Sequence, residues 1–197
     1  MEKQEVRLYF DRLAPQWDVQ CCHSASAIER ILSLAQIGQG DHVLDVGCGT
    51  GVLFPYYLSH GVSSLLGVDL SPEMISFAKK KVSDPRVSLV CADAETYPFP
   101  RRFHQCMIYS AFPHFPNPDA LLKNLAKALL PNGRITVAHS EGRKTIDMRH
   151  LGSAHAVSRR LEPAEMLAKR FAAYFSVDTI LDEDSFYLVS GVRHTEI

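Results

Sequence analysis

The sequence has no excess of charge of either sign and no long apolar segment. Its 21 basic and 22 acidic residues give a formal net charge of -1, which is not the positive field that nucleic-acid binding normally requires. The charged start, residues 1–5, is followed by no apolar run long enough for a signal peptide or a membrane span. We therefore expect a cytoplasmic protein without a membrane span, and we disfavour nucleic acid as its partner.

Cysteine is scarce as well, and its spacing fits no metal site. The five cysteines are odd in number and none forms a Cys-X-X-Cys pair, so we expect reduced thiols. Adjacent cysteines such as Cys21 and Cys22 rarely form a disulfide with each other, and their role stays open. His150 and His155 lie five residues apart and cannot share one helix face, so we expect no metal.

A glycine-rich turn follows directly on the strand-like segment Val43–Val46. Its pattern is Gly-X-Gly-X-Gly from Gly47 to Gly51, and glycine both permits positive φ and lets the backbone approach a ligand. A dinucleotide fingerprint would place its third glycine at Val52, and no Gly-Lys-Ser/Thr follows for a phosphate-binding loop. Asp45 stands two residues before the first glycine, which suits a cationic ligand better than a diphosphate.

Strand-like and helix-like segments alternate along the chain. We predict helices at residues 4–13, 26–35, 52–59, 71–81, 119–130 and 163–173, and strands at 43–46, 64–68, 87–90, 103–109, 134–138, 176–181 and 185–192. This alternation implies a parallel sheet with helices on both faces. A hairpin-length connection joins the last two strands, so the last strand should be antiparallel. The expected fold is α/β, a Rossmann-like, seven-stranded, mostly parallel sheet.

Acidic residues follow the first three predicted strands. Ligands of open α/β sheets bind at the carboxyl ends of the strands, so we expect Asp45, Asp69 and Asp93 to face one site. Asp69 can accept hydrogen bonds from both hydroxyls of a ribose, because a carboxylate has two acceptor oxygens. Asp93 is placed to accept from an adenine amino group, with the Ala94 amide as a donor to the ring. Taken singly, such aspartates are also common helix caps.

Three motifs, DVGCGTG from Asp45, VDLSPEM from Val68 and CADAETYPF from Cys91, resemble those of class I S-adenosylmethionine-dependent methyltransferases. The resemblance covers roughly residues 41–192 and implies S-adenosylmethionine as cofactor, with methyl transfer by in-line displacement. It also implies a set of cofactor-binding residues: Asp45, Gly47, Cys48, Gly49, Gly51, Asp69, Leu70, Met74, Asp93, Ala94 and Tyr109.

The N-terminal stretch YFDRLAPQWD, from Tyr9, is similar to the opening of methyltransferases related to ubiquinone and menaquinone biosynthesis. In that group the segment folds over the cofactor and helps to close the substrate pocket. The resemblance therefore implies that Tyr9, Phe10 and Trp17 contact the substrate. The alternative is that these aromatic residues only pack a helix against the sheet edge. We expect one domain, residues 1–197, with an N-terminal helical cap (1–40) and a catalytic sheet (41–197).

The remaining substrate residues are expected after the fourth and fifth predicted strands. Methyl transfer needs a base only if the nucleophile loses a proton, and His114 is our candidate for that base, with a structural role as the alternative. Residues 140–160 are expected to form a substrate lid. The stretch 143–160 carries five basic residues against one acidic residue, and Arg143 and Arg149 could hold an anionic acceptor.

His139 is also predicted to bind substrate, at the edge of this lid. The alternative for the lid is a solvated polar loop. We predict methyl transfer to a small acceptor, which is anionic if the basic lid binds it. The alternatives are a non-catalytic S-adenosylmethionine-binding accessory or regulatory protein, and an RNA or protein methyltransferase. The acceptor and the oligomeric state stay unknown.

Overall fold

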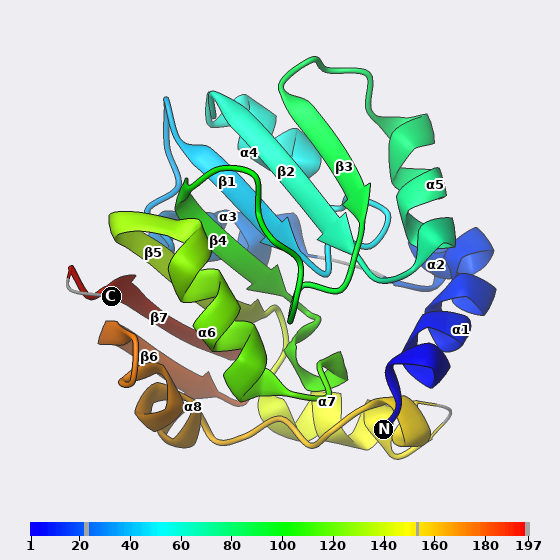
Figure 1. Ribbon diagram of the computed structural model, residues 1–197. Helices are drawn as coiled ribbons and strands as arrows, with labels where there is room; N and C mark the ends of the chain where they lie inside the picture. The colour runs from blue at the N-terminus through cyan, green and yellow to red at the C-terminus, as the bar shows by residue number, and fades with distance from the viewer. Residues whose placement is uncertain (22–23, 153, 196–197) are drawn as a thin grey trace.

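The computed structural model describes residues 1–21, 24–152 and 154–195. A seven-stranded sheet forms its centre, in the order β3-β2-β1-β4-β5-β7-β6 (Figure 1). All neighbouring strands from β3 to β5 are parallel, and β7 is antiparallel to both its neighbours, which confirms the predicted fold class. The strands are β1 His42–Val46, β2 Ser64–Asp69, β3 Val87–Cys91, β4 Phe103–Tyr109, β5 Leu129–His139, β6 Phe175–Glu183 and β7 Phe186–Arg193.

Helices connect these strands, and polar caps start three of them. The side chains of Ser24, Ser71 and Asn117 each accept a hydrogen bond from the amide three residues later, which satisfies one of the free donors at a helix start. The helices are α1 Lys3–Leu13, α2 Trp17–Gln20, α3 Ala25–Leu34, α4 Phe54–Ser59, α5 Pro72–Lys81, α6 Pro118–Ala128, α7 Arg143–His150 and α8 Ala164–Phe171. Short 3₁₀ turns are η1 Ala14–Gln16, η2 Phe112–His114 and η3 His155–Val157.

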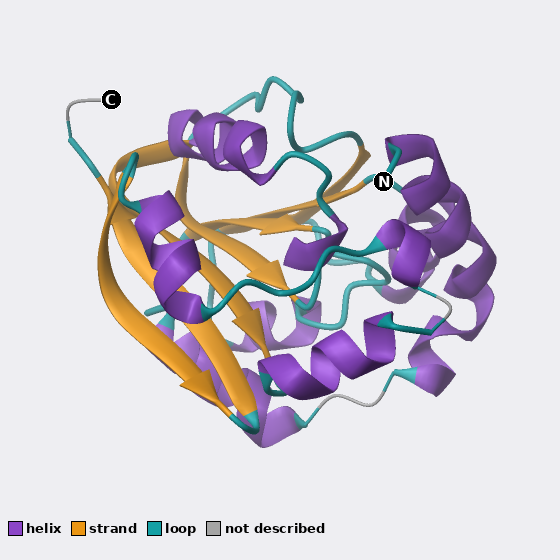
Figure 2. Cartoon of the chain, turned by 90° about the horizontal axis from the view of Figure 1, so that it is seen from below, coloured by secondary structure: helices purple, strands orange, loops and turns teal. Residues whose placement is uncertain are grey.

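Helices cover both sides of the sheet (Figure 2). On one side α6 and α8 contribute Leu121, Leu125 and Phe171, which are fully buried against the strands. On the other side α3 and α4 contribute Ile31 and Phe54. Burying one such side chain contributes about 1.5–3 kcal/mol relative to leaving it exposed. The sheet is therefore held from both faces, and the ends of its strands are left for a site.

The end of α6 differs from the prediction, which continued this helix to Leu130. The strand β5 begins at Leu129, whose backbone pairs with Phe103 of β4. The residue before a proline is biased away from helical backbone angles, and Pro131 places this restriction on Leu130. The lid also differs, because its first part is the helix α7, for which we predicted no element.

The cap over the sheet is shorter than the predicted residues 1–40. The helix α3 packs into the core, whereas α1, η1 and α2 lie beside α5 at the carboxyl ends of the strands (Figure 1). The Asp11 carboxylate accepts from the Ser71 hydroxyl at 2.6 Å, and Asp18 accepts from the Thr50 hydroxyl at 2.6 Å. Val6 of α1 packs with residues of the lid. In the described ranges, no helix is long and apolar enough to cross a membrane.

Candidate functional site

A cleft opens at the carboxyl ends of β1, β2 and β4, under the cap. Its empty volume, counted out to open solvent, is about 910 Å³. The structure brings together in its lining all but one of the predicted cofactor residues, the exception being Gly51. Those that line it are Asp45, Gly47, Cys48, Gly49, Asp69, Leu70, Met74, Asp93, Ala94 and Tyr109.

The glycine turn adopts the backbone that its sequence requires. Gly47, Gly49 and Gly51 have φ of +70°, +53° and +86°, a region that other residues rarely adopt. A Cβ on Gly47 would stand 2.6 Å from the Ala111 side chain, and one on Gly51 would stand 2.5 Å from the Phe54 ring. Gly51 is therefore needed for helix packing, while Gly47 and Gly49 let the backbone face the cleft.

Asp69 joins the glycine turn to the start of α5. One carboxylate oxygen accepts from the Gly49 amide and the other from the Ser71 amide, both at 2.8 Å. A carboxylate offers about four acceptor positions, so each oxygen keeps one for a further donor. Burial raises the pKa of Asp69 to about 6, although the hydrogen bonds from these amides lower it. The carboxyl group is therefore mainly ionised at neutral pH. These two positions fit the adjacent hydroxyls of a ribose.

Asp45 supplies a second carboxyl group, and this one is buried. Its side chain is 2% exposed, and burial, followed by the negative charge of Asp69, raises its pKa to about 8. The buried Tyr57 hydroxyl faces this carboxyl and lowers its pKa, without reaching hydrogen-bond geometry. A nearby cation favours the ionised form of a carboxyl. Together with Asp69, Asp45 therefore fits a ligand that carries an ammonium or sulfonium charge.

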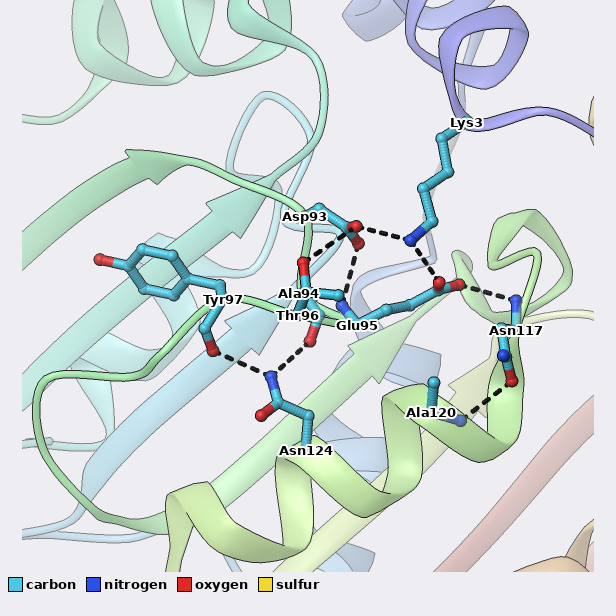
Figure 3. A network of polar contacts seen from close by, with 9 residues as sticks. All are labelled: Lys3, Asp93, Ala94, Glu95, Thr96, Tyr97, Asn117, Ala120 and Asn124. Atoms are coloured by element: carbon cyan, nitrogen blue, oxygen red, sulfur yellow. Dashed lines mark hydrogen bonds and ion pairs between the residues drawn. The ribbon is translucent and has the colours of Figure 1, made fainter.

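Asp93 lines the cleft and is also bound by the N-terminal helix. The Lys3 ammonium lies between two carboxylates, at 2.6 Å from Asp93 and 2.6 Å from Glu95 (Figure 3). Glu95 is buried, and its carboxylate also accepts a hydrogen bond from the backbone amide of Asn117 at 2.7 Å. Burial lowers the pKa of Lys3, but the hydrogen bonds and charges of the two carboxylates outweigh it and raise this pKa. Lys3 thus fastens α1 over the predicted adenine end of the cleft.

Replacing Lys3 by methionine should speed cofactor dissociation several-fold, because the contact that holds α1 over the cleft is lost. Trp17 is the one tryptophan of the sequence and it lines the cleft, so stopped-flow tryptophan fluorescence can follow release of S-adenosylhomocysteine. The exposed Lys127 of α6 provides the matched control, Lys127→Met. Equal dissociation rates in the two variants would show that the Lys3 contact does not restrain the ligand.

The predicted aromatic residues of the cap gather around His114. Phe10 and Trp17 line the cleft, and the Phe10 ring contacts those of Tyr9, Trp17 and His114, with centroids 5.3, 5.6 and 4.8 Å away. His114 Nδ1 donates to the Val157 carbonyl at 2.9 Å. Because a carbonyl only accepts, the proton is on Nδ1 and Nε2 is left as an acceptor. Burial lowers the pKa of His114 to about 4, so the imidazole ring is neutral at pH 7.

The basic residues of the lid do not meet the cleft. Arg143 pairs with Asp182 at 3.2 Å and Arg149 with Glu141 at 2.7 Å, and neither lines the cleft. The positive charge counted along residues 143–160 is thus offset in space by carboxylates from outside that stretch. His139 is 3% exposed at the end of β5 and is likewise absent from the lining.

Several cleft residues were not found from the sequence. The backbone after β4 approaches the cleft closely, and Ser110 there has a positive φ of 52°. The Pro/aromatic turn after β4 is a signal that could have indicated this, whereas nothing in the sequence marks the first turn of α1. The missed residues are Lys3, Val6, Val52, Leu53, Val68, Ala92, Glu95, Ser110, Ala111, Phe115 and Pro116. Cys22 and His23 lie outside the described residues, and within these no group of three ligating side chains is arranged to hold a metal.

Comparison with known proteins identifies the kind of domain that carries this cleft. Residues 43–133, which carry β1, the glycine turn, Asp69 and Asp93, match the family model of the methyltransferase domain. This part of the chain is a methyltransferase domain of the class I S-adenosylmethionine-dependent type. The predicted family and cofactor are therefore confirmed.

Among curated proteins, the chain is similar to the malonyl-[acyl-carrier protein] O-methyltransferase of Priestia megaterium, with 30% identity over 160 residues, 79% of this chain and 58% of that protein. It is also similar to the ubiquinone biosynthesis O-methyltransferase of Coxiella burnetii, with 33% identity over 100 residues, 49% of this chain and 42% of that protein. The chain thus matches about half the length of these relatives.

Solved structures share the fold at lower identity. A methyltransferase in complex with the Trm112 methyltransferase activator of Haloferax volcanii has a TM-score of 0.82 and 20% identity, with 98% of this chain and 99% of that chain covered. The N-methyltransferase NodS of Bradyrhizobium japonicum, in complex with S-adenosylhomocysteine, has a TM-score of 0.73 and 16% identity, with 95% and 98% covered.

Proposed function

We propose that this protein transfers the methyl group of S-adenosylmethionine to a small acceptor by in-line displacement. The observation that carries the proposal is Asp69, whose carboxylate is oriented by the amides of Gly49 and Ser71 and keeps an acceptor position on each oxygen. Asp69 would hold the ribose hydroxyls. Asp45 and the glycine turn would hold the charged methionine end, and Met74 and Ala94 would pack beside the adenine.

The bound cofactor supplies an activated methyl group on a sulfonium sulfur. The protein supplies orientation, because reacting atoms held in line react far faster than free ones. Phe10 and Trp17 would exclude water from the acceptor end, where His114 presents an acceptor nitrogen. We retain His114 as the proposed base for an acceptor that must lose a proton.

The prediction that the acceptor is anionic has less support than the prediction that it is small. It depends on Arg143 and Arg149, and each of these pairs with a carboxylate outside the cleft. An anion would have to displace Asp182 or Glu141 before it could bind an arginine. The cytoplasm stays the location that we predict from the charged start of the sequence and the lack of a long apolar run after it.

Radiolabel transfer tests the proposal. The protein, incubated with methyl-labelled S-adenosylmethionine and fractionated extract of the host, should move label into a small-molecule fraction and yield S-adenosylhomocysteine. An Asp69→Ala variant is the control and should transfer no label. Binding of the cofactor without turnover on any fraction would favour the alternative of a non-catalytic accessory or regulatory protein.

A macromolecular acceptor is the second candidate. It is favoured by the structural similarity, across 98% of this chain, to a methyltransferase bound to the Trm112 activator. On this alternative the chain would act on RNA or protein together with a protein partner. Label recovered in macromolecules, and only after a partner protein is added, would replace the small acceptor.

A further inference from the structure

A buried tyrosine lies behind the glycine turn, near the end of β1. The helix α4 begins shortly after this turn, and its residues Phe54 and Tyr57 are three apart, so they lie on one face. An added Cβ on Gly51 would stand 2.5 Å from the Phe54 ring. Tyr57 is 0% exposed and belongs to the same core cluster as Val43 and Cys48. The helix thus places a phenol hydroxyl on the core side of the glycine turn.

The hydroxyl of Tyr57 is buried without a hydrogen-bond partner. A buried tyrosine hydroxyl usually finds a partner, because an unpaired polar group inside the protein costs stability. The group that it faces is the carboxyl of Asp45, whose pKa it lowers although burial raises it. Asp45 lines the cleft. An unpaired donor beside a cleft carboxyl indicates a hydrogen bond that forms in another state of the site.

The two aspartates Asp45 and Asp69 differ in the donors around them. Asp69 accepts hydrogen bonds from two backbone amides, which stabilise its charge before any ligand binds. Among the described residues no amide donates to the Asp45 carboxyl, and burial, followed by the Asp69 charge, raises its pKa to about 8. An ionised Asp45 therefore needs other donors. The cofactor's ammonium can supply one from the cleft, and the Tyr57 hydroxyl can supply one from the core.

The other titratable groups that face Asp45 are poorer donors. They come from the turn, from β2 and from β4, and they are Cys48, Asp69 and Cys106. The Cys48 thiol is directed at a backbone carbonyl at 3.8 Å, and Asp69 is mainly an anion. The Cys106 thiol is buried, and a thiol is a weaker donor than a phenol hydroxyl. Tyr57 is thus the strongest side-chain donor that the described residues direct at this carboxyl.

We propose that Tyr57 is a positioning residue for the cofactor, whose hydroxyl donates to the Asp45 carboxylate once that group is ionised, as it is when the ligand's ammonium binds. This inference rests on the proposed function, in which Asp45 holds the charged methionine end. On binding, the Asp45 proton leaves to solvent, and the carboxylate is held between the ligand and α4. Tyr57 does not line the cleft and acts through Asp45 alone.

The substitution Tyr57→Phe removes the hydroxyl and keeps the ring, and its effect should depend on pH. Because the hydroxyl favours the ionised carboxyl, its loss should raise the pKa of Asp45 above that of the unmodified protein. At pH 6 the carboxyl of the free protein is protonated in both proteins. Binding must then ionise it without the hydroxyl, so the affinity for S-adenosylhomocysteine should fall several-fold. Above both pKa values the carboxyl is ionised before binding, and the two affinities should converge.

Isothermal titration calorimetry from pH 6 to pH 9 measures this effect as the ratio of the two dissociation constants for S-adenosylhomocysteine. Titration of the ligand is common to both proteins and cancels in the ratio. A rise of one unit in the pKa gives a ratio of about ten at pH 6 and about two at pH 9. The matched control is Tyr187→Phe, at an equally buried tyrosine that does not line the cleft. Its ratio should stay near one at every pH.

Nuclear magnetic resonance gives the pKa of Asp45 directly. The carboxyl ¹³C resonance of Asp45 in the free protein should titrate with a higher midpoint in Tyr57→Phe than in the unmodified protein. If this variant does not fold by circular dichroism, the ¹³Cζ resonance of Tyr57 in the unmodified protein replaces it. That resonance should shift with the same midpoint as the Asp45 carboxyl, and a resonance that does not respond at this midpoint would overturn the proposal.

A loss of affinity that is equal at every pH would assign Tyr57 a structural role and overturn the proposal, as would an unchanged midpoint of Asp45 in Tyr57→Phe. Label transfer on the same proteins separates this proposal from the proposed function. Cofactor binding and label transfer without the pH-dependent ratio reject only the role of Tyr57. The ratio without label transfer to any fraction rejects only the methyl transfer, and absence of cofactor binding rejects both.

Discussion

Asp69→Ala should weaken binding of S-adenosylhomocysteine by at least about 100-fold in isothermal titration calorimetry at neutral pH. The substitution would remove the two charge-assisted hydrogen bonds that we propose Asp69 makes to the ribose, each worth about 1.5–3 kcal/mol. It also removes the acceptor for the Gly49 and Ser71 amides, which hold the glycine turn against α5. Loss of direct contacts and loss of the ordered turn therefore act in the same direction.

The matched control is Asp84→Ala, at an aspartate that precedes β3, does not line the cleft and pairs with Arg86 at 2.7 Å. This variant should bind the ligand as the unmodified protein does. If Asp69→Ala fails to fold by circular dichroism, Asp69→Asn provides a substitution of the same shape, which should still weaken binding clearly. An unchanged dissociation constant in a folded Asp69 variant would contradict the assignment of this residue to the ribose.

The sheet and the cofactor end of the cleft could be predicted because their requirements are local. Some structural features can be recognised from a few neighbouring residues. Examples are a glycine with a positive φ, an aspartate at the end of a strand and a Ser-Pro start of a helix. Gly49, Asp69 and Ser71 have these local signals, and in the fold the amides of Gly49 and Ser71 both donate to the Asp69 carboxylate. The antiparallel last strand was predictable for the same reason, since its hairpin lies within a few residues.

The contacts of the cap and of the acceptor end could not be predicted in this way, because they join distant parts of the chain. Lys3 and Asp93 are 90 residues apart in sequence, and no local pattern relates them. The excess of basic residues counted along the lid was misleading for the same reason. It suggested arginines that could bind an anion, but the carboxylate that pairs with Arg143 comes from β6. Burial of His139 and His150 beside His114 depends on how α7 packs, which periodicity did not indicate.

The affinity for S-adenosylhomocysteine should rise with pH between pH 6 and pH 8, because Asp45 must lose a proton to pair with the ligand's ammonium. In the free protein burial holds the pKa of Asp45 at about 8, so the group is mostly protonated over this range. A ligand that binds only the ionised form then gains about tenfold in affinity per pH unit and levels off above the pKa. Calorimetry across this range should show a gain of about 50-fold, with release of up to one proton on binding.

The Asp45→Asn variant separates this effect from other titrations. Asparagine has nearly the same shape and no proton to lose, so its affinity should be lower at pH 8 and nearly independent of pH. Any dependence that persists in Asp45→Asn belongs to the ligand or to Asp69, whose pKa of about 6 places its titration at the lower end of the range. A pH dependence of equal size in both proteins would contradict the role of Asp45. A dependence confined to the unmodified protein would mean that the acidic end of β1 binds the charged part of the cofactor, and that this carboxyl is held mainly protonated until the cofactor arrives.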